Sequence, residues 1–324
     1  MLRYRWCLGL LGIVAGCLWL ISAATTVALP CERRPLVFYS NQSRHDLKLT
    51  LCEAIRSARS SLYVSVYGVT DLDVIRLINR QAEAGVAVTL CYDASASLAL
   101  GKYLHPKVSH TAAKGKGLMH QKVIVVDDSQ VFVGSANLTE QSLHMHDNFV
   151  VGLFHPPLAR FLQTAGHSFC APLGGQEVEA WQLPGGGPQA MDRLLALIGK
   201  ARKSIYVAMF TLTHPSLVAS LVEAAQRGVD VRCAIDFYTA RGASLKAMRR
   251  LQEANIPVFL SRGKQLLHHK WAWIDKKTLV TGSANWTKAA FQVNRESLLI
   301  LRPLSRDQRT TLRRLWSTIE LDAN

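Results

Sequence analysis

Residues 267–285 read LHHKWAWIDKKTLVTGSAN, and residues 119–137 read MHQKVIVVDDSQVFVGSAN. Both stretches contain the pattern H-x-K-x4-D-x6-G-S-x-N at identical spacing. Its members are His120, Lys122, Asp127, Gly134, Ser135 and Asn137 in the first copy, and His268, Lys270, Asp275, Gly282, Ser283 and Asn285 in the second. A single match is explained by an ordinary strand followed by a turn. Two matches in one chain indicate a duplicated unit with a common purpose.

The duplication extends beyond the motifs. Residues 55–93 align with residues 198–236 without a gap, and the identical pairs include Tyr63/Tyr206, Gly85/Gly228 and Asp93/Asp236. Self-similarity of this kind indicates two copies of one structural unit. In each copy we expect an apolar strand, a helix (about 71–84 and 215–227) that stops at its glycine, and a second apolar strand. The apolar runs KVIVVD and KWAWID predict one more buried strand in each copy.

These patterns predict an α/β fold. Strand–helix–strand units favour parallel pairing with a right-handed crossover, so we expect two tandem repeats with mixed, mainly parallel sheets, related by a pseudo-twofold axis. The Gly- and Pro-rich stretch 171–190 predicts a linker between a first repeat at 31–170 and a second at 191–324. Residues 305–320 predict an amphipathic closing helix.

The first thirty residues differ from the rest. Arg3 and Arg5 precede an uncharged run to Leu29 that contains small residues suited to signal cleavage. The run is also long enough to span a bilayer, so a signal peptide and an uncleaved N-terminal anchor are both compatible with it. A lipoprotein-type box at residues 14–17 is disfavoured, because the apolar stretch continues after Cys17. In either case we expect the remainder to be periplasmic, secreted or membrane-associated.

The composition restricts the partners. The formal net charge is +15, from 38 Lys and Arg against 23 Asp and Glu. This excess favours nucleic acid, an anionic lipid surface or a phosphorylated substrate, and it does not choose among them. We find no segment of alternating aromatic and basic residues of the kind that grips single strands.

Cysteine usage indicates neither a disulfide framework nor a metal site. The five cysteines beyond the leader are odd in number and widely spaced, with no C-x-x-C element: Cys31, Cys52, Cys91, Cys170 and Cys233. Cys91 and Cys233 lie in apolar strands and are expected to be buried free thiols. A Cys31–Cys52 disulfide is compatible with the sequence but not indicated by it. We expect no metal and no cofactor.

The motif residues suit phosphoryl chemistry. Side chains two apart on a strand share a face, so His120 projects with Lys122, and His268 with Lys270. An imidazole, an ammonium and an amide converging on one point suit a tetrahedral phosphoryl group. A pseudo-twofold would join both sets, so that one histidine attacks phosphorus and the other protonates the leaving oxygen. A phosphohistidine is then hydrolysed by water activated by the second histidine.

The duplicated H-x-K-x4-D-x6-G-S-x-N pattern resembles that of the phospholipase D superfamily, and the likeness covers nearly all of residues 35–320. The resemblance implies tandem α/β/α sandwich repeats and a catalytic pair, His120 and His268, with the first more often the nucleophile. It assigns phosphate binding to Lys122, Lys270, Asn137 and Asn285, and to Ser135 and Ser283, which line the site. Asp127 and Asp275 belong to the catalytic motif with a supporting, mainly structural role.

One position departs from the family pattern. Relatives commonly carry an acidic residue after G-S-x-N that hydrogen-bonds the histidine; the second copy has Glu296, whereas the first has Asn148. A carboxylate stabilises imidazolium, while an amide only fixes a tautomer. We therefore hypothesise that His268 is the protonated general acid and His120 the neutral nucleophile.

Several other polar residues are open to two interpretations. Lys114 and Lys116 lie six and four residues before His120, and Arg262 and Lys264 lie at the same intervals before His268. These four residues either form a basic rim around the site or belong to solvated loops. Residues on a predicted helix either steer a polyanion or face water: Arg241, Lys246, Arg249 and Arg250. His144, His146 and His269 are interpreted as bystanders.

The sequence favours a metal-independent phosphodiesterase of the phospholipase D type that hydrolyses phospholipid headgroups at a membrane. The N-terminal segment supports this, because it would bring the site to its substrate, and a basic surface attracts anionic leaflets. An exported or tethered nuclease and a phosphatidyltransferase of the cardiolipin synthase type remain alternatives. A non-catalytic phosphate-binding protein is disfavoured by intact histidines in both motifs. Because both halves are complete, we expect a monomer to build the whole site.

Overall fold

The computed structural model describes residues 27–43, 45–261 and 265–323. Most of the predicted leader, and Arg262 and Lys264 of the predicted basic rim, therefore lie outside the described residues. Of the helices in the described ranges, none combines the length and the apolarity needed to cross a bilayer.

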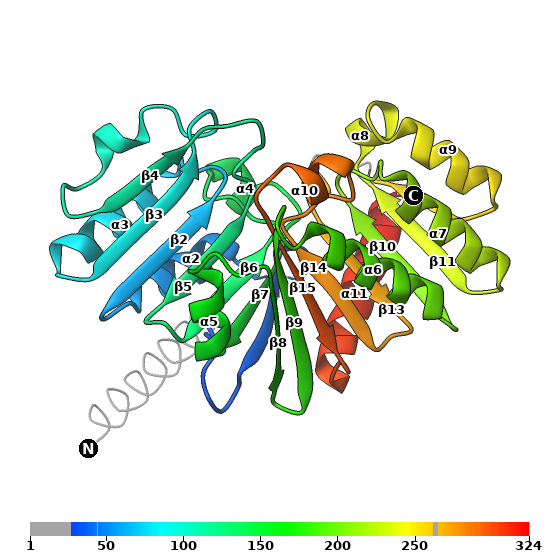
Figure 1. The fold of residues 1–324 in the computed structure, drawn as a ribbon, viewed down its shortest axis with the longest axis horizontal. Coiled ribbons are helices and arrows are strands. Elements are labelled where there is room, and N and C mark those ends of the chain that lie inside the picture. The colour runs from blue at the N-terminus through cyan, green and yellow to red at the C-terminus, as the bar shows by residue number, and fades with distance from the viewer. Residues whose placement is uncertain (1–26, 44, 262–264, 324) are drawn as a thin grey trace, which may run out of the picture.

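Two sheets form the framework (Figure 1). The first has the order β1-β7-β6-β5-β2-β3-β4, with β1 (Leu36–Ser40), β2 (Ser61–Val66), β3 (Ala87–Asp93), β4 (Ser109–Ala113), β5 (Lys122–Val126), β6 (Gln130–Gly134) and β7 (Phe149–Phe154). The second has the order β12-β11-β10-β13-β14-β15-β9-β8, with β8 (Ser168–Leu173), β9 (Gln176–Leu183), β10 (Ser204–Met209), β11 (Asp230–Ile235), β12 (Val258–Leu260), β13 (Lys270–Ile274), β14 (Thr278–Gly282) and β15 (Glu296–Arg302).

Helices connect these strands. The α-helices are α2 (Leu47–Arg56), α3 (Leu72–Glu83), α4 (Glu140–His144), α5 (Pro156–Leu162), α6 (Gly187–Lys200), α7 (Pro215–Gln226), α8 (Phe237–Arg241), α9 (Leu245–Glu253), α10 (Lys288–Gln292) and α11 (Arg306–Ala323). Short 3-10 helices are η1 (Asn41–Ser43) and η2 (Leu100–Tyr103). The expected helices at 71–84, 215–227 and 305–320 thus correspond to α3, α7 and α11. Gly85 and Gly228 follow α3 and α7 with φ of 93° and 85°, a conformation that glycine adopts without steric cost.

The two repeats have the same strand order, which confirms the predicted duplication. Reading inward from β1, the first sheet matches the second read from β9, and β8 is an additional edge strand. The stretch 171–190 is therefore not a plain linker. It contains part of the β8–β9 hairpin, and β9 pairs with β15 as β1 pairs with β7. The turn residues Gly174 and Gly175, both at positive φ, explain why this stretch looks like a linker in sequence.

The sheets are mixed, as expected, but they are not mainly parallel. Parallel pairing joins β2, β3 and β4 in the first sheet and β10, β11 and β12 in the second. The other strand pairs are antiparallel. The expectation was wrong because the strand–helix–strand unit is confined to one side of each sheet, while the motif strands form hairpins, which require antiparallel pairing.

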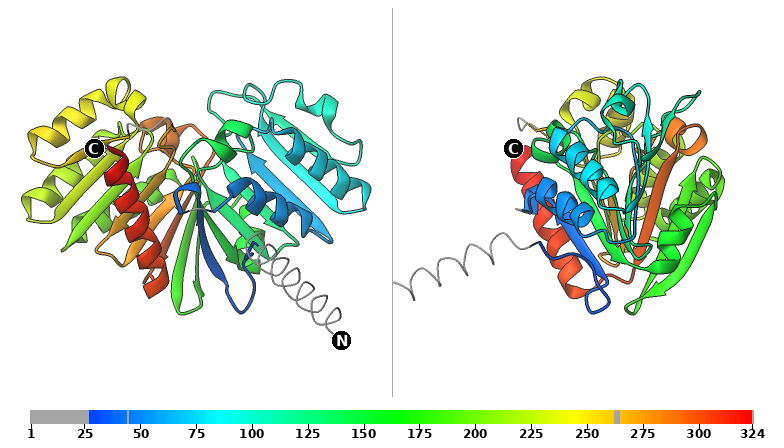
Figure 2. Two further views of the ribbon diagram at one scale, coloured as in Figure 1. Left: turned by 180° about the vertical axis from the view of Figure 1, so that it is seen from behind. Right: turned by 90° about the vertical axis from the view of Figure 1, so that its left-hand side faces the viewer.

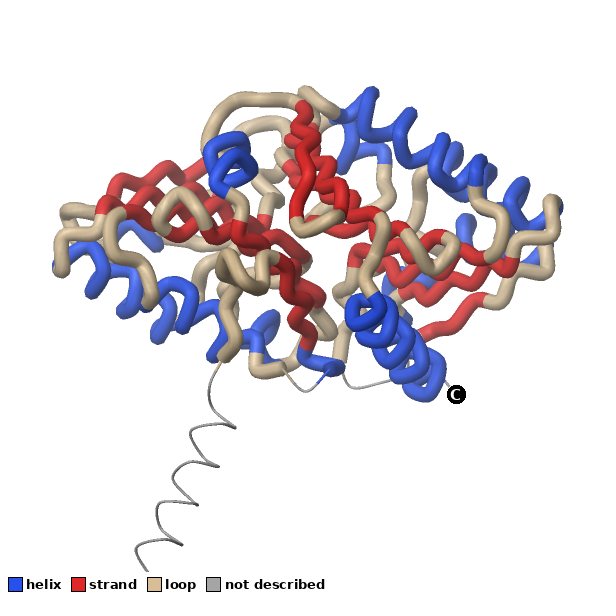
Figure 3. The backbone as a smooth tube through the Cα atoms, turned by 90° about the horizontal axis from the view of Figure 1, so that it is seen from below, coloured by secondary structure: helices blue, strands red, loops and turns tan. Residues whose placement is uncertain are grey.

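Three apolar cores hold this arrangement. One lies between the second sheet and α6, α7 and α9, and another between the first sheet and α2 and α3. Viewed from below, the helices cover opposite outer sides of the two sheets (Figure 3). The third core joins the repeats: Val123 and Val151 of the first sheet pack in one cluster with Trp271 and Leu299 of the second. From behind, α11 lies against the second sheet near this junction (Figure 2), and Trp316 belongs to the third core.

Cysteines contribute to packing as single thiols. All five in the described residues are free, including Cys31 and Cys52, so the disulfide that the sequence allowed is not formed. Cys233 is fully buried, and burial raises the pKa of its thiol to about 12, as expected for an inert core residue.

The motif aspartates have matching structural roles. Asp127, at the β5–β6 turn, accepts backbone N–H bonds of 2.8–3.0 Å from Arg59, Ser60 and Ser61. Asp275 likewise accepts N–H bonds from residues 202–204 in the second repeat. Burial opposes ionisation of Asp127, but these hydrogen bonds outweigh it and hold the pKa below its usual value. Each aspartate therefore fastens a hairpin turn to the segment that enters the neighbouring strand.

We expect Asp127→Asn to destabilise the fold by about 1–3 kcal/mol, because the amide presents N–H groups to backbone donors that need an acceptor. Urea unfolding measures this loss. The control is Asp128→Asn at the exposed neighbouring position, which should change the free energy of unfolding by less than about 0.5 kcal/mol. Activity per folded molecule should stay unchanged in both; a loss of turnover in Asp127→Asn alone would contradict a purely structural role.

Candidate active site

Both histidine motifs lie at the same edge of their sheets. Lys122 begins β5 and pairs with Val66 at the end of β2, and Lys270 begins β13 and pairs with Met209 at the end of β10. Each histidine lies two residues before the lysine that begins its strand. Because β3 and β11 run parallel to β2 and β10, the segments that follow them leave from the same edge. The two edges face each other across the junction of the repeats.

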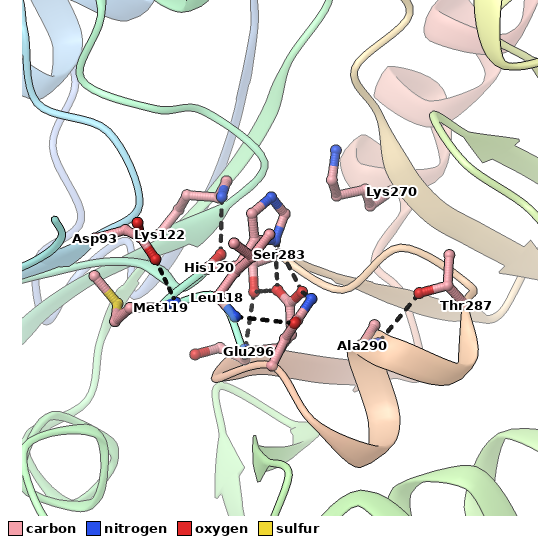
Figure 4. A network of polar contacts seen from close by, with 12 residues as sticks. Asp93, Leu118, Met119, His120, Lys122, Lys270, Ser283, Thr287, Ala290 and Glu296 are labelled. Atoms are coloured by element: carbon pink, nitrogen blue, oxygen red, sulfur yellow. Dashed lines mark hydrogen bonds and ion pairs between the residues drawn. The ribbon is translucent and has the colours of Figure 1, made fainter. Parts of the chain in front are cut away.

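His120 is held by a carboxylate of the other repeat (Figure 4). Its Nδ1 lies 2.8 and 2.9 Å from the two carboxylate oxygens of Glu296, a fully buried residue at the start of β15. Ser283 donates its hydroxyl to the same carboxylate at 2.5 Å. The backbone N–H of His120 also donates to the carbonyl of Arg295 at 2.8 Å. A carboxylate at Nδ1 requires a proton there and leaves Nε2 free for chemistry.

His268 is held in the mirrored way by an amide. Its Nδ1 lies 2.9 Å from Oδ1 of Asn148, which also accepts the Ser135 hydroxyl at 2.7 Å. The Asn148 amide nitrogen donates to the carbonyls of Ser142 and His146 at 2.7 and 3.3 Å, and this fixes which end faces the imidazole. His268 therefore carries its proton on Nδ1, and its Nε2 is also free.

This crossed pairing corrects the sequence-based hypothesis. We expected Glu296 to support His268 of its own repeat, and Asn148 to support His120. Each instead reaches the histidine of the other repeat. Equal spacing along the chain does not distinguish these options, because the pseudo-twofold places both partners at the junction.

The G-S-x-N segments build this support. A Cβ on Gly134 or Gly282 would lie 2.2 or 2.1 Å from a carbonyl oxygen of the adjacent strand, so only glycine fits at either position. We expected Ser135 and Ser283 to bind substrate phosphate. Their hydroxyl protons are instead given to Asn148 and Glu296, so these serines position the histidine partners.

The motif lysines are almost fully buried. Lys122 and Lys270 donate to the carbonyls of His120 and His268 at 2.8 and 2.9 Å. Burial lowers the pKa of Lys122 to about 7, with Glu296 opposing the shift. Burial and Lys122 together lower the pKa of Lys270 well below its usual value. Such lysines lack a full counterion, and an incoming phosphate anion would supply one.

Both catalytic candidates titrate below the ordinary histidine value. Burial and then Lys122 lower the pKa of His120, while Glu296 raises it. Burial, Lys270 and Lys122 lower the pKa of His268 well below 6.5, with no carboxylate to oppose them. Without an anion in the site, His268 is thus the more firmly neutral of the two.

The remaining predicted site residues divide into two groups. Asn137 and Asn285 are half-buried, and their amide oxygens are buried without a partner among the described residues, so phosphate binding by them stays a prediction. Asp127 and Asp275 lie away from the lysines. Lys122 begins the five-residue strand β5 and Asp127 follows its end, roughly 16 Å away at 3.3 Å per residue. We grouped these aspartates with the catalytic motif in a supporting, mainly structural role, and their backbone hydrogen bonds agree with the structural role.

Sequence reasoning missed the rings beside the histidines. Tyr67 lies edge-on to His120 at 5.2 Å between ring centroids, and Phe210 lies edge-on to His268 at 5.0 Å. The lysine ammonium groups lie 5.3 and 5.1 Å from the same two rings. Tyr67 and Phe210 occupy aligned positions of the duplicated segments, which is the signal that could have revealed them.

Two aligned aspartates were also given no role in the sequence analysis. Asp93 accepts the backbone N–H of Met119, just before His120, at 3.0 Å. Asp236 accepts that of Leu267, just before His268, at 3.2 Å. They fix the segments that carry the histidines.

The three histidines interpreted as bystanders have different positions. His144 is exposed at the end of α4. His269 is fully buried and bonds Gln42 at 2.7 Å, a structural contact. His146, however, lies with its ring centroid 5.8 Å from that of His268 and therefore borders the site. The equivalent position in the second repeat is Asn294, whose amide is 3.4 Å from Glu296.

The predicted basic residues are exposed where they are described. Lys114 and Lys116 lie in the segment between β4 and His120, while Arg241, Lys246, Arg249 and Arg250 lie on α8 and α9. Arg241 stacks on Phe237 at 3.8 Å. The segments 55–93 and 198–236 are offset by 143 residues and the two histidine motifs by 148, so the second repeat has five extra residues (148 − 143 = 5). They fall in the region between β11 and β13, which contains α8 and α9.

Comparison with known proteins agrees with this geometry. Residues 51–165 and 194–316 match the family described as "Cardiolipin synthase, PLD-like domain". The chain is 37% identical over 117 residues to mitochondrial cardiolipin hydrolase of Canis lupus familiaris, which covers 36% of this chain and 45% of that protein. It is 34% identical over 104 residues to phospholipase D of Rickettsia bellii, covering 32% and 51%. The chain thus spans about half the length of the curated relatives it matches.

The solved phosphatidylserine synthase of Haemophilus influenzae Rd KW20 has a similar fold. Its TM-score is 0.71 at 14% identity, covering 91% of this chain and 88% of that chain. Nearly the whole described architecture is therefore shared with one known protein.

The lysine pKa values predict that anion binding takes up protons. Sulfate, a tetrahedral dianion that does not titrate near neutrality, should raise the pKa of Lys122 from about 7 and bind with proton uptake at pH 8. Its affinity should fall by up to about tenfold per pH unit above pH 7 for each proton taken up. Calorimetry in two buffers of different ionisation enthalpy measures the uptake. Lys122→Met should remove up to about one proton of it, and an unchanged uptake in this variant would contradict the assignment.

Proposed function

The chain belongs to the phospholipase D-like family, and from that membership we propose that it is a metal-independent phosphodiesterase that hydrolyses phospholipid headgroup esters through a phosphohistidine. The observation that carries the proposal is the crossed pair of hydrogen bonds, Glu296 to His120 and Asn148 to His268. These bonds join two histidine–lysine sets from distant parts of the chain into one buried polar site. A site of this kind needs both repeats of a single chain and no second subunit.

His120 is the nucleophile. Its Nε2 attacks phosphorus as the bond to the leaving oxygen breaks, and the ring becomes a phosphorylated imidazolium with its remaining proton on Nδ1. That cation persists for the lifetime of the intermediate, so a buried carboxylate at 2.8 Å is of most use here. Glu296 also increases the electron density at Nε2 before the attack.

His268 is the general acid and then the base. With substrate bound, its Nε2 carries a proton, which passes to the leaving oxygen as that oxygen departs. An amide partner does not stabilise the imidazolium, so the proton is easily given up. The neutral ring keeps Nδ1–H on Asn148 and takes a proton from the water that attacks the phosphohistidine, while the P–N bond to His120 breaks. His120 is then neutral again.

The role of each histidine agrees with the sequence-based hypothesis, but the reason differs. That hypothesis gave His268 the carboxylate and used it to stabilise an acid. The carboxylate belongs to His120, where it stabilises the covalent intermediate instead. Lys122 and Lys270, with the half-buried Asn137 and Asn285, neutralise charge on the phosphoryl oxygens.

Phospholipid is the proposed substrate class because the relatives reported above are named for cardiolipin hydrolysis and phospholipase D activity. We further propose that the chain is exported or membrane-anchored, and the apolar run of its first thirty residues supports this. Either location would bring the site to a lipid surface.

The substrate class is tested by a panel of phosphodiesters in EDTA. We expect headgroup release from phosphatidylglycerol or cardiolipin vesicles, lost by at least about 1,000-fold in His120→Ala because a nucleophile is removed. Added alcohol would reveal transfer in place of hydrolysis. Cleavage of single- or double-stranded nucleic acid without lipid hydrolysis would instead establish the nuclease alternative.

The division of roles is tested by trapping. Reactions quenched in base should label His120, because phosphohistidine is stable to base and labile to acid. In His268→Ala the label should form more slowly, because the general acid is missing, and should persist once formed, because water is no longer activated. Glu296→Gln should slow phosphoenzyme formation by about 10- to 100-fold, the value of one charge-assisted hydrogen bond. Glu179→Gln, at a buried carboxylate that pairs with Arg193 away from the site, is the matched control and should form the intermediate normally. Label on His268 would reverse the assignment.

A further inference from the structure

Exposed apolar side chains gather at the edge that carries the active site. Leu98 follows β3, and Tyr238 follows β11, so both leave from the edge at which Lys122 and Lys270 lie. Their exposures are 81% and 71%. In Figure 1, α4, α8 and α10 all lie at this upper side of the molecule.

Three more of these side chains lie within three residues of His120, Asn148 or Glu296 in the sequence. Leu118, Met145 and Val293 are 41%, 53% and 44% exposed. Leu118 lies two residues before His120, Met145 three before Asn148, and Val293 three before Glu296. Figure 4 shows Leu118 beside the network of His120 and Glu296.

The first and the last of these form one rigid ridge. The backbone N–H of Leu118 donates to Asn294 Oδ1 at 3.1 Å, and the N–H of Arg295 donates to the Leu118 carbonyl at 2.8 Å. A Cβ on Gly117 would lie 2.2 Å from the carbonyl oxygen of Val293, so the two segments are in close contact. The ridge therefore joins the two repeats at the site, with the Leu118 and Val293 side chains held outward.

Positive charge lies beside this apolar surface. Lys114 and Lys116 precede Leu118, and residues 94–118 contain no acidic residue. Residues 285–295 contain Lys288 and Arg295 and again no acidic residue. These four cationic side chains are exposed. Apolar side chains that project beside exposed cations match the layered chemistry of an anionic bilayer, with phosphates outside and acyl chains beneath.

We propose that this edge is a bilayer-docking surface, defined by Leu98, Leu118, Met145, Tyr238 and Val293 with the neighbouring cations Lys114, Lys116, Lys288 and Arg295, and that its partner is an anionic phospholipid membrane. The inference rests on the proposed function and adds how the site meets its substrate. On docking, the aliphatic side chains enter the headgroup region of the bilayer. The phosphodiester then reaches the histidines while the acyl chains of the lipid stay in the membrane.

The aliphatic character of the ridge favours a membrane over nucleic acid. Sequence-tolerant binding of single strands uses aromatic platforms on which bases stack. Leu118, Met145 and Val293 offer no such face, whereas burial of aliphatic groups in lipid stabilises binding in proportion to area.

The full-length chain is tested on one headgroup in two physical forms: phosphatidylglycerol vesicles and monomeric dibutyroyl phosphatidylglycerol. The double variant Leu118→Ser/Val293→Ser should lower kcat/KM on vesicles by about tenfold or more, the effect of withdrawing two aliphatic side chains from lipid. Its kcat/KM on the monomer should equal that of the wild type. Leu321→Ser, at a 75% exposed leucine of α11 outside the docking surface, should change neither.

Charge is tested separately. Lys114→Ala/Lys116→Ala should lower kcat/KM on phosphatidylglycerol vesicles by about ten- to thirtyfold, at roughly 1 kcal/mol per cation, and leave the monomer unaffected. The effect should disappear when the substrate is diluted in phosphatidylcholine at high salt.

The outcomes separate the inference from the proposed function. A double variant that loses vesicle and monomer hydrolysis equally, or neither, overturns the docking surface while leaving the phosphodiesterase intact. A wild-type chain that hydrolyses neither form of the lipid overturns the proposed function, and the docking inference with it.

Discussion

Two buried hydrogen bonds that cross between the repeats are the constraint on which the site depends. A fully buried carboxylate such as Glu296 is tolerated only when it is well paired, and here it accepts from His120 and Ser283, with Asn294 at its rim. These partners come from both halves of the chain. The apolar core between the sheets, which includes Val123 and Trp271, holds the halves at the separation that the bonds require. The complete site therefore exists only where the two repeats are packed together.

The duplication supplies two equal sets of reactive groups, and the neighbouring residues make them unequal. His120 has a carboxylate and the ring of Tyr67, whereas His268 has an amide, the ring of Phe210 and a further imidazole, His146. Burial lowers the pKa of both histidines, and only at His120 does a carboxylate, Glu296, oppose that shift. The two histidines have different tasks in the proposed mechanism. The one that forms the covalent intermediate must carry a positive charge while phosphorus is attached, and the other must release a proton to the leaving oxygen. The asymmetry of the partners meets that need.

Sequence alone predicted the repeats, the helices α3, α7 and α11, and the residues at the centre of the site, because each depends on local pattern and on a motif given twice. It failed where the answer depends on how the copies face each other. The partner of Glu296 cannot be read from equal spacing, since a pseudo-twofold exchanges partners without changing any interval. The β8–β9 hairpin was hidden for a different reason: the glycines of its turn and the prolines beside it look like a linker, although β9 is the strand equivalent to β1. Asp127 was carried with the motif although a strand separates it from the chemistry.

The proposed roles also fix a direction across the site. In-line displacement places the leaving oxygen opposite His120 Nε2, so the headgroup lies on the His268 side and the part of the substrate that stays on phosphorus lies on the other. The ridge of Leu118 and Val293 stands beside His120 and is aliphatic, while His146 borders His268 and is polar. For a phospholipid, the retained part carries the acyl chains and the departing part is the polar alcohol. The aliphatic ridge thus faces the bilayer that holds the retained acyl chains, outside the phosphate site itself, and the polar border lies on the side of the departing alcohol.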